Sequence, residues 1–477
     1  MMQRTYQSLA LGLVACSFFG CSLAPQYTRP DMPVPAELPV SASIGSGTGS
    51  SKAEQGSQAG LNVGETGWAS FYTDPGLRQV IGTALANNRD LRETALSVGT
   101  FQAQYRIQRS ELFPNIGADG SWTKQRSYSG GQYGTGEMYA VGVGITSYEL
   151  DFFGRVRNLN EDALEQYLAQ TEVHRAAVIS LVAETARAYL SLLADRELLA
   201  ISENTFKNEE ESYGLVEQRF NGGIANSLEL AQSRTMLERV RGSVAQYQLQ
   251  REQDMNYLTL LAGTGLADPS ANGQRLEEHD LTLALPANLP SSVLLQRPDI
   301  QAAEHQLKAA NASVGAARAA FFPSIRLTGN AGYMGPDFDD LFDGSTGVWL
   351  FSPSVNLPIF TGGRLQAQLD VAELRKEAGI VSYEKAIQNA FREVADALAA
   401  QRWLAEQVAA QKAYVEASQE YYDLAVARYM EGIDSFLTQL DAQRSLFEAR
   451  QSYVMLRLAQ QNNQVNLFKA LGGGWKE

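Results

Sequence analysis

The segment Leu112-Phe113-Pro114-Asn115-Ile116 returns 209 residues later as Phe321-Phe322-Pro323-Ser324-Ile325. One constant shift that relates so many positions indicates a tandem duplication, roughly residues 80–265 and 289–474. The same offset pairs identical residues along both halves of the chain: Asp90 with Asp299, Arg109 with Arg318, Arg155 with Arg364, Glu184 with Glu393, Arg219 with Arg428, Gly223 with Gly432, and Leu237 with Leu446.

Each copy begins with a predicted helix followed by two predicted strands. The helix, about 77–112 or 297–320, ends at Phe-Pro because the residue before a proline avoids the helical region. Strands of about ten residues with alternating character suit a tilted membrane-spanning β-strand, although a single pair also fits an ordinary half-buried hairpin. The predicted strands are about 115–125 and 138–150 in the first copy, and about 325–333 and 348–357 in the second.

The alternation is clearest in the second strand of the first copy. One face would carry Tyr139, Val141, Val143 and Ile145, and the other Ala140, Gly142, Gly144 and Thr146. One apolar and one small or polar face is what a strand between lipid and a polar lumen requires.

A very long helix follows each strand pair. It starts near Arg155 or Arg364 and runs about 65 residues to glycine signals at Gly222-Gly223 and at Gly432, roughly 100 Å of helix. Apolar positions recur in steps of three and four, the pattern of an antiparallel coiled coil. The chain then reverses, and a shorter helix returns over about 226–262 or 434–471.

Composition excludes several classes of protein. The 477 residues carry a formal net charge of −14, which argues against a nucleic-acid binder because such proteins need a basic footprint. Past residue 20 no run of 18 apolar residues occurs, so no transmembrane helix is expected. The three histidines stand far apart without a cysteine beside them, and no phosphate loop or His-centred dyad is present. We therefore expect neither an enzyme nor a bound metal or cofactor.

The N-terminus indicates an exported lipoprotein. Residues 1–20 combine Arg4 with an apolar run too short to span a bilayer, which is typical of a secretory signal. Cys21 follows Phe18-Phe19-Gly20 as in a lipoprotein box, so we expect a covalent N-terminal lipid with palmitate at Cys21. Cys16, after Leu13-Val14-Ala15, is the competing lipidation site, and an unmodified cysteine in a discarded signal is the plainer alternative.

These signals divide the chain into five segments. They are a signal peptide (1–20), an extended linker and equatorial segment (21–75), a first repeat (76–265), an inter-repeat linker (266–295) and a second repeat with a C-terminal equatorial segment (296–477). Four strands cannot close a barrel, and an open sheet edge cannot stand in lipid. Three copies sharing one barrel would supply twelve strands, and their long helices would form a tube across the periplasm.

The chain resembles the TolC-type outer-membrane factor family, and within it the OprM-like lipoprotein channels of drug-efflux pumps. The resemblance implies a mainly α-helical homotrimer whose twelve-stranded transmembrane β-barrel continues into a long antiparallel α-helical barrel. It also implies that this outer-membrane channel docks on a periplasmic adaptor protein and an inner-membrane RND-type pump. The matching segments include Ala86-Asn87-Asn88-Arg89-Asp90-Leu91, Tyr148-Glu149-Leu150-Asp151-Phe152-Phe153-Gly154-Arg155, Arg297-Pro298-Asp299-Ile300, Leu357-Pro358-Ile359-Phe360 and Leu440-Asp441-Ala442-Gln443-Arg444.

The same resemblance implies a gate and two docking tips. Leu437 and Asp441 are four apart, so they share a helix face, and in the family these positions form an apolar and an acidic ring at the periplasmic mouth. The plainer alternative makes Leu437 coiled-coil core and Asp441 a surface residue, just as the tip glycines are explained by helix capping alone. The residues expected to meet the adaptor are Arg219, Phe220, Gly223, Arg428, Tyr429, Gly432 and Ile433.

Three other functions fit part of the sequence. A TolC-type exit channel could serve type I protein secretion or metal-ion efflux in place of drug efflux. A periplasmic adaptor or other structural coiled-coil protein would explain the long helices and the lipid anchor. It would not explain the duplicated strand pairs.

Overall fold

The computed structural model describes residues 22–39, 66–269 and 289–476, together with Leu276, Leu281 and Leu283. The expected signal peptide, with Cys16, and the lipidation site Cys21 lie outside the described residues, as do much of the first linker and part of the second. The chain forms two compact units. The first comprises Met1–Asp31, Leu96–Glu172 and Gln301–Lys385, and the second comprises Met32–Ala95, Val173–Ile300 and Ala386–Glu477.

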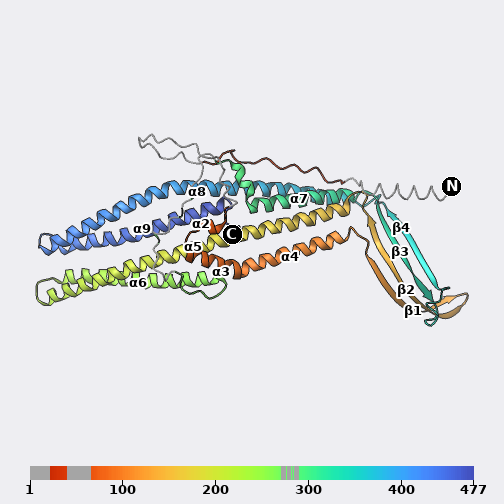
Figure 1. Ribbon diagram of the computed structural model, residues 1–477, viewed down its shortest axis with the longest axis horizontal. Helices are drawn as coiled ribbons and strands as arrows, with labels where there is room; N and C mark the ends of the chain where they lie inside the picture. Colours follow the sequence, from red (N-terminus) through yellow and green to blue (C-terminus); the bar gives the residue numbers. More distant parts are fainter. Residues whose placement is uncertain are drawn as a thin grey trace. The chain divides into compact units, whose positions relative to one another are not determined.

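The first unit contains a four-stranded sheet in the order β1-β2-β3-β4, with every neighbouring pair antiparallel (Figure 1). Its outer edges are β1 and β4, which pair on one side only within the described chain. The strands are β1 (Ile116–Ser129), β2 (Gln132–Leu150), β3 (Ser324–Gly335) and β4 (Gly347–Asn356).

The register gives the sheet one apolar face, as expected from the alternation in β2. Trp122 lies opposite Tyr139, and Val141 lies opposite Tyr333 on the next strand. The other face carries mostly small or polar residues such as Ser121, Gly142 and Asn330. The apolar face comprises Ile116, Trp122, Tyr139, Val141, Val143, Ile145, Tyr333, Trp349, Phe351 and Val355.

The first hairpin is longer than expected from the sequence. Pairing continues to Ser129 opposite Gln132, where Gly130 and Gly131 take positive φ angles of 61° and 89° and turn the chain. The stretch Gln132–Glu137 is polar and glycine-rich, so it lacks the apolar alternation that marks a strand. Backbone pairing with β1 forms the strand there without that signal.

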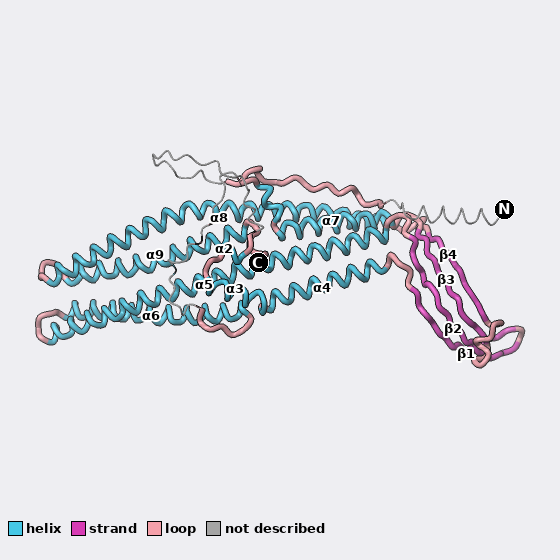
Figure 2. The backbone as a smooth tube through the Cα atoms, in the orientation of Figure 1, coloured by secondary structure: helices cyan, strands magenta, loops and turns pink. Residues whose placement is uncertain are grey.

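The helices repeat one order, α4-β1-β2-α5-α6 and then α7-β3-β4-α8-α9. Figure 2 shows the long helices in cyan and the strands in magenta. The two longest, α5 and α8, have 67 residues each, or roughly 100 Å at 1.5 Å per residue. The bounds are α2 (Trp68–Phe71), α3 (Pro75–Asn87), α4 (Arg89–Ser110), α5 (Arg155–Asn221), α6 (Ser227–Ala262), η4 (Ser291–Gln296), α7 (Pro298–Ala319), α8 (Arg364–Met430) and α9 (Phe436–Ala470).

The helix expected over 77–112 is two helices, α3 and α4, so that prediction was wrong. Asn88 breaks it because its backbone is extended, with φ −60° and ψ 133°. Its side chain accepts a hydrogen bond from the N–H of Leu91 and thereby caps α4. Its amide donates to the carbonyl of Leu261, which fixes the break against the end of α6.

The core of the second unit lies where α2, α3, α5 and α9 meet. The rings of Phe71 and Phe468 stack 4.1 Å apart, and Tyr72 and Tyr189 are fully buried beside them. Burial of such large rings is the main source of stability for a helical core. The side chain of Asp74 caps α3 by accepting the N–H of Leu77.

Among the described helices, α5 contains an 18-residue stretch long and apolar enough to cross a membrane by length and composition alone. Within the protein, 61 % of that stretch is buried. Packing against neighbouring helices accounts for its apolar character, as for any core helix.

Candidate gate, docking tips and strand–helix junction

The reversal between α5 and α6 is a six-residue capping motif. Gly223 has φ 74°, and a Cβ there would meet nothing within 4 Å, so its backbone conformation alone favours glycine. The N–H of Ile224 donates to the carbonyl of Arg219 at 2.8 Å, and the N–H of Gly223 donates to that of Phe220 at 2.9 Å. Asn226 then starts α6 by accepting the N–H of Glu229.

The reversal between α8 and α9 repeats the same geometry. Gly432 has φ 71°, and the N–H of Ile433 donates to the carbonyl of Arg428 at 2.9 Å. Here the Arg428 guanidinium also donates to the carboxylate of Asp434 at 2.6 Å. That hydrogen bond and the guanidinium charge hold the pKa of Asp434 below its usual value. The capping explanation of the tip glycines therefore holds, and it leaves a docking role open.

A polar contact joins the two tips. Arg219 at the end of α5 donates to the hydroxyl of Tyr429 near the end of α8 at 2.6 Å. The same guanidinium lies over the Tyr429 ring, 5.5 Å from its centroid. Beneath them a shared apolar core binds the hairpins together: Val216, Met236, Val240, Phe436, Leu440 and Phe447.

The two predicted gate residues lie on the exposed side of α9. Leu437 is 55 % exposed in the single chain, and Asp441 is exposed four residues further on. Phe436 and Leu440 point into the tip core instead. The spacing thus brings Leu437 and Asp441 onto one face that no other described segment covers.

A buried carboxyl group lies on α5, twelve residues before that helix ends. Glu209 is only 1 % exposed, and its Oε1 atom has no hydrogen-bond partner. Burial raises its pKa to about 7, although the positive charge of Arg444 on α9 opposes the shift. The periodicity of the sequence gives no sign of this group, because burial of a lone carboxyl is decided by tertiary packing.

A pair of half-buried carboxyl groups lies between α5 and α6. Asp254 is hydrogen-bonded to Asp195, and burial together with that neighbour raises its pKa to about 7. Both side chains border a cavity of about 430 Å³ that also contacts Tyr247 and Met455. Sequence reasoning missed this pair, since the two residues stand far apart along the chain.

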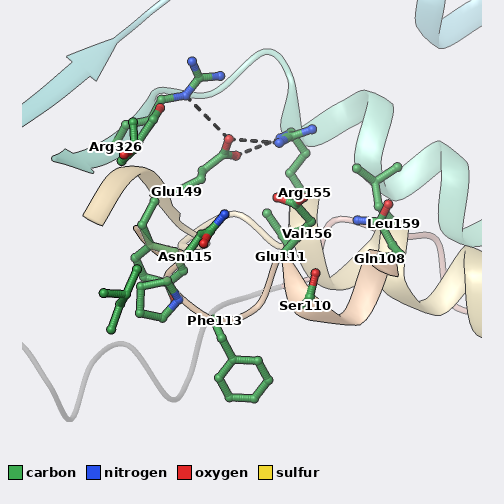
Figure 3. Close-up of a pocket in the computed structure, with 15 residues that line it drawn as sticks. Gln108, Ser110, Glu111, Phe113, Asn115, Glu149, Arg155, Val156, Leu159 and Arg326 are labelled. Atoms are coloured by element: carbon green, nitrogen blue, oxygen red, sulfur yellow. Dashed lines mark hydrogen bonds and ion pairs between the residues drawn. The ribbon is translucent and has the colours of Figure 1, made fainter. Parts of the chain in front are cut away.

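Ion pairs brace the junction between strands and helices (Figure 3). Glu149, at the end of β2, accepts from Arg155 at 2.7 Å and lies 3.8 Å from Arg326 of β3. These groups border a cavity of about 920 Å³, whose rim includes Phe113 and Ile116 at the start of β1. The Phe113 ring points away from the ion pairs and is 63 % exposed.

The N-terminal segment after Cys21 is tied to the helices of the first unit. The hydroxyl of Ser22 donates to Asn158, in the first turns of α5, at 2.9 Å. Further along, Arg29 donates three hydrogen bonds to the carboxylate of Glu304 on α7. Burial would raise the pKa of Glu304, but Arg29 and Lys308 hold it below its usual value.

Among the described residues, no group of three or more His, Cys, Asp or Glu side chains is placed to hold a metal ion. The polar features described above are caps, ion pairs and buried carboxyls. These contacts cap helices, link the strands to the helices and join neighbouring helices.

Comparison with known proteins gives one consistent family. The family described as outer membrane efflux protein matches the chain twice, over residues 80–264 and 289–473. The antibiotic efflux pump outer membrane protein ArpC and the toluene efflux pump outer membrane protein TtgC, both of Pseudomonas putida, are 47 % identical over 477 residues, covering 99 % of this chain and 96 % of theirs. The cation efflux system protein CusC of Escherichia coli is 42 % identical over 470 residues, covering 97 % of this chain and 98 % of its own.

Solved structures agree. A membrane protein from Pseudomonas aeruginosa superposes with a TM-score of 0.87 at 40 % identity, covering 96 % of this chain and 98 % of that one. The open state of the MtrE outer membrane channel of Neisseria gonorrhoeae gives 0.85 at 38 % identity, covering 96 % and 99 %. The chain belongs to the outer membrane efflux protein family, the TolC-type channels that its sequence motifs predicted.

Proposed function

We propose that three copies of this outer-membrane efflux protein form one exit duct, with a twelve-stranded barrel continued by a helical barrel across the periplasm. The observation that carries the proposal is the sheet itself. It has one apolar face, and its edges β1 and β4 pair on one side only within the described chain. A sheet in lipid must close, and four strands are too few, so several copies have to share the barrel.

The periplasmic tips would meet the adaptor protein of a pump whose inner-membrane component is of the RND type. Apolar side chains at both reversals support this role, because Ile224 is 73 %, Met430 77 % and Ile433 63 % exposed. Large apolar side chains left exposed at the ends of both hairpins favour a protein-binding surface there. Leu437 and Asp441 would then gate the mouth as an apolar ring and an acidic ring around the three-fold axis.

A lipid at Cys21 would anchor the N-terminus to the outer membrane. Ser22, the next residue, is hydrogen-bonded to Asn158, which lies only eight residues after β2 ends at Leu150. A lipid on Cys21 would thus lie beside the strand ends that enter the membrane. One acyl set binds weakly alone, but the barrel supplies the second membrane contact. Intact-mass analysis of the native protein and of Cys21→Ser tests this proposal. We expect the substitution to remove the acyl mass, and acylation that persists in Cys21→Ser would show that Cys16 is the lipidated residue.

The cargo would be antibiotics, solvents or similar small toxic compounds. Relatives named for antibiotic and toluene efflux, each 47 % identical, support this cargo class. The cation efflux relative CusC, at 42 % identity, favours metal-ion efflux as the second candidate.

Detergent-purified protein in planar bilayers provides the central test, with chemical crosslinking to count subunits. We expect discrete channels and a crosslinked ladder that ends at three. A protein that stays soluble without detergent and never conducts would instead be a periplasmic coiled-coil protein. Restored resistance to solvents or to metal salts in an efflux-deficient strain then separates the two cargo classes.

A further inference from the structure

Within the chain, the contact between β2 and β3 ends in a stacked pair of rings. Leu150, the last residue of β2, lies opposite Ile325 near the start of β3. Three residues past Leu150, Phe153 stacks on Phe322, with ring centroids 4.8 Å apart and planes 22° apart. One strand therefore leaves the sheet beside the point where the next enters it, and two phenylalanines close that corner.

The two outer edges of the sheet carry corresponding phenylalanines, and no ring contact within the described residues pairs them. The offset of 209 residues relates Phe322 to Phe113, which lies just before β1. Leu150-Asp151-Phe152-Phe153 aligns with Leu357-Pro358-Ile359-Phe360, just after β4, at an offset of 207, because the second copy has two more residues before the arginine that starts its long helix. Phe113 is 63 % exposed and Phe360 is 90 % exposed, whereas their counterparts pack on each other.

We propose that Phe360 of one copy stacks on Phe113 of the next copy, as Phe153 stacks on Phe322 within the chain. The inference rests on the proposed three-copy assembly and adds the residues and the register of its seam. Edge strands β4 and β1 run in opposite directions, so β4 of one copy can pair antiparallel with β1 of its neighbour. The exposed rings then meet where the two strands enter the helices.

The repeat also sets the register of that seam. Because Leu150 lies opposite Ile325, and Leu357 lies at the end of its strand as Leu150 does, Leu357 of one copy should lie opposite Ile116 of the next, and Val355 opposite Ala118. Alignment at the offset of 209 would instead place Val355 opposite Gly120, so the two registers differ by two residues. The first register places like faces together, since Val355 and Ala118 both belong to the apolar face. A slip by one residue would turn the apolar face of β4 against the polar face of β1.

The same register has a second consequence toward the outer end of the strands. Counting along both strands without a bulge brings Phe351 of β4 opposite Trp122 of β1. Both rings are unusually exposed in one chain, at 61 % and 60 %. Cross-strand aromatic pairs stabilise a sheet, so one register satisfies both the corner rings and this pair.

Engineered disulfides test the register, since both native cysteines lie at positions 16 and 21. We expect Ala118→Cys with Val355→Cys in one chain to give a covalent trimer on oxidation, because directly opposed residues lie within disulfide reach. Either single substitution should leave monomers on the denaturing gel. The pair Gly120→Cys with Val355→Cys, two residues out of register, is the matched control and should crosslink much less.

A double-mutant cycle tests the ring contact. Phe113→Ala and Phe360→Ala should each lower the temperature at which trimers dissociate in detergent, and the double variant should lower it no further than the more disruptive single one. Phe338→Ala, at a similarly exposed ring outside the seam, serves as the control and should change it little. Additive effects, or crosslinking only in the slipped pair, would overturn the proposed seam while the trimer stands. A native mass of one chain for the unmodified protein would instead refute the three-copy assembly itself.

Discussion

The carboxylate of Asp441 distinguishes the second hairpin from the first. The offset of 209 residues relates it to Gln232 on α6, which is half-buried and carries no charge. Three copies would thus bring three carboxylates, and not six, to the mouth. A ring of like charges favours cations and disfavours anions.

Asp441→Ala should weaken this ring and loosen the closed mouth. We expect higher single-channel conductance and a lower preference for potassium over chloride, measured from the reversal potential in a salt gradient. Gln232→Ala, at the related position, should leave both quantities unchanged. If the two variants behave alike, Asp441 is a surface residue and no gate.

The buried Glu209 should make stability depend on pH. Its pKa rises from 4.5 to about 7, so the folded state holds a proton that the unfolded state releases. Stability from this group is therefore present below about pH 4.5 and declines as the pH rises toward 7. The full loss is ~3 kcal/mol at most, since one pKa unit corresponds to about 1.4 kcal/mol.

Glu209→Gln should remove that decline. We expect the unfolding midpoint of the variant to exceed that of the native protein at pH 8 and to approach it at pH 5. Glu210→Gln, at the adjacent exposed position, is the control and should shift neither. An equal offset at both pH values would show that Glu209 is ionised in the folded protein throughout.

At the scale of elements, a substitution in a tip turn can distinguish a helix-capping role of that turn from a role in docking. A side chain at Gly432 would find open space but a strained backbone, at a cost of about 1–2 kcal/mol. That strain is local, so Gly432→Val should leave trimers intact. It should nevertheless reposition Ile433 and abolish complementation of an efflux-deficient strain. Gly214→Val tests a helical glycine of α5 with equally open space and should complement. If Gly432→Val abolished trimers, the turn would have a structural role only.

The elements also show what a sequence can predict. The constant offset located both strand pairs, both long helices and both reversals, because these depend on local glycine, proline and apolar patterns. The break at Asn88 was missed because its amide is fixed by Leu261, 173 residues away. Leu437 and Asp441 could be placed on one helix face by spacing alone. Phe113 and Phe360 could not be assigned, since their predicted partners belong to other copies of the chain.

At the scale of the whole molecule, the net charge of −14 per chain would act on ions that pass through the proposed duct. Three acidic chains around one water-filled lumen would raise the local cation concentration. The Debye length is about 10 Å at 0.1 M salt and about 3 Å at 1 M, so salt should screen this field. We therefore expect cation preference to be strong at low salt and to shrink toward none at 1 M. Asp441→Ala should remove only the part that arises at the mouth, leaving a residual preference with the same salt dependence. A preference that Asp441→Ala abolishes at every salt concentration would show that one ring, and not the whole lumen, sets selectivity.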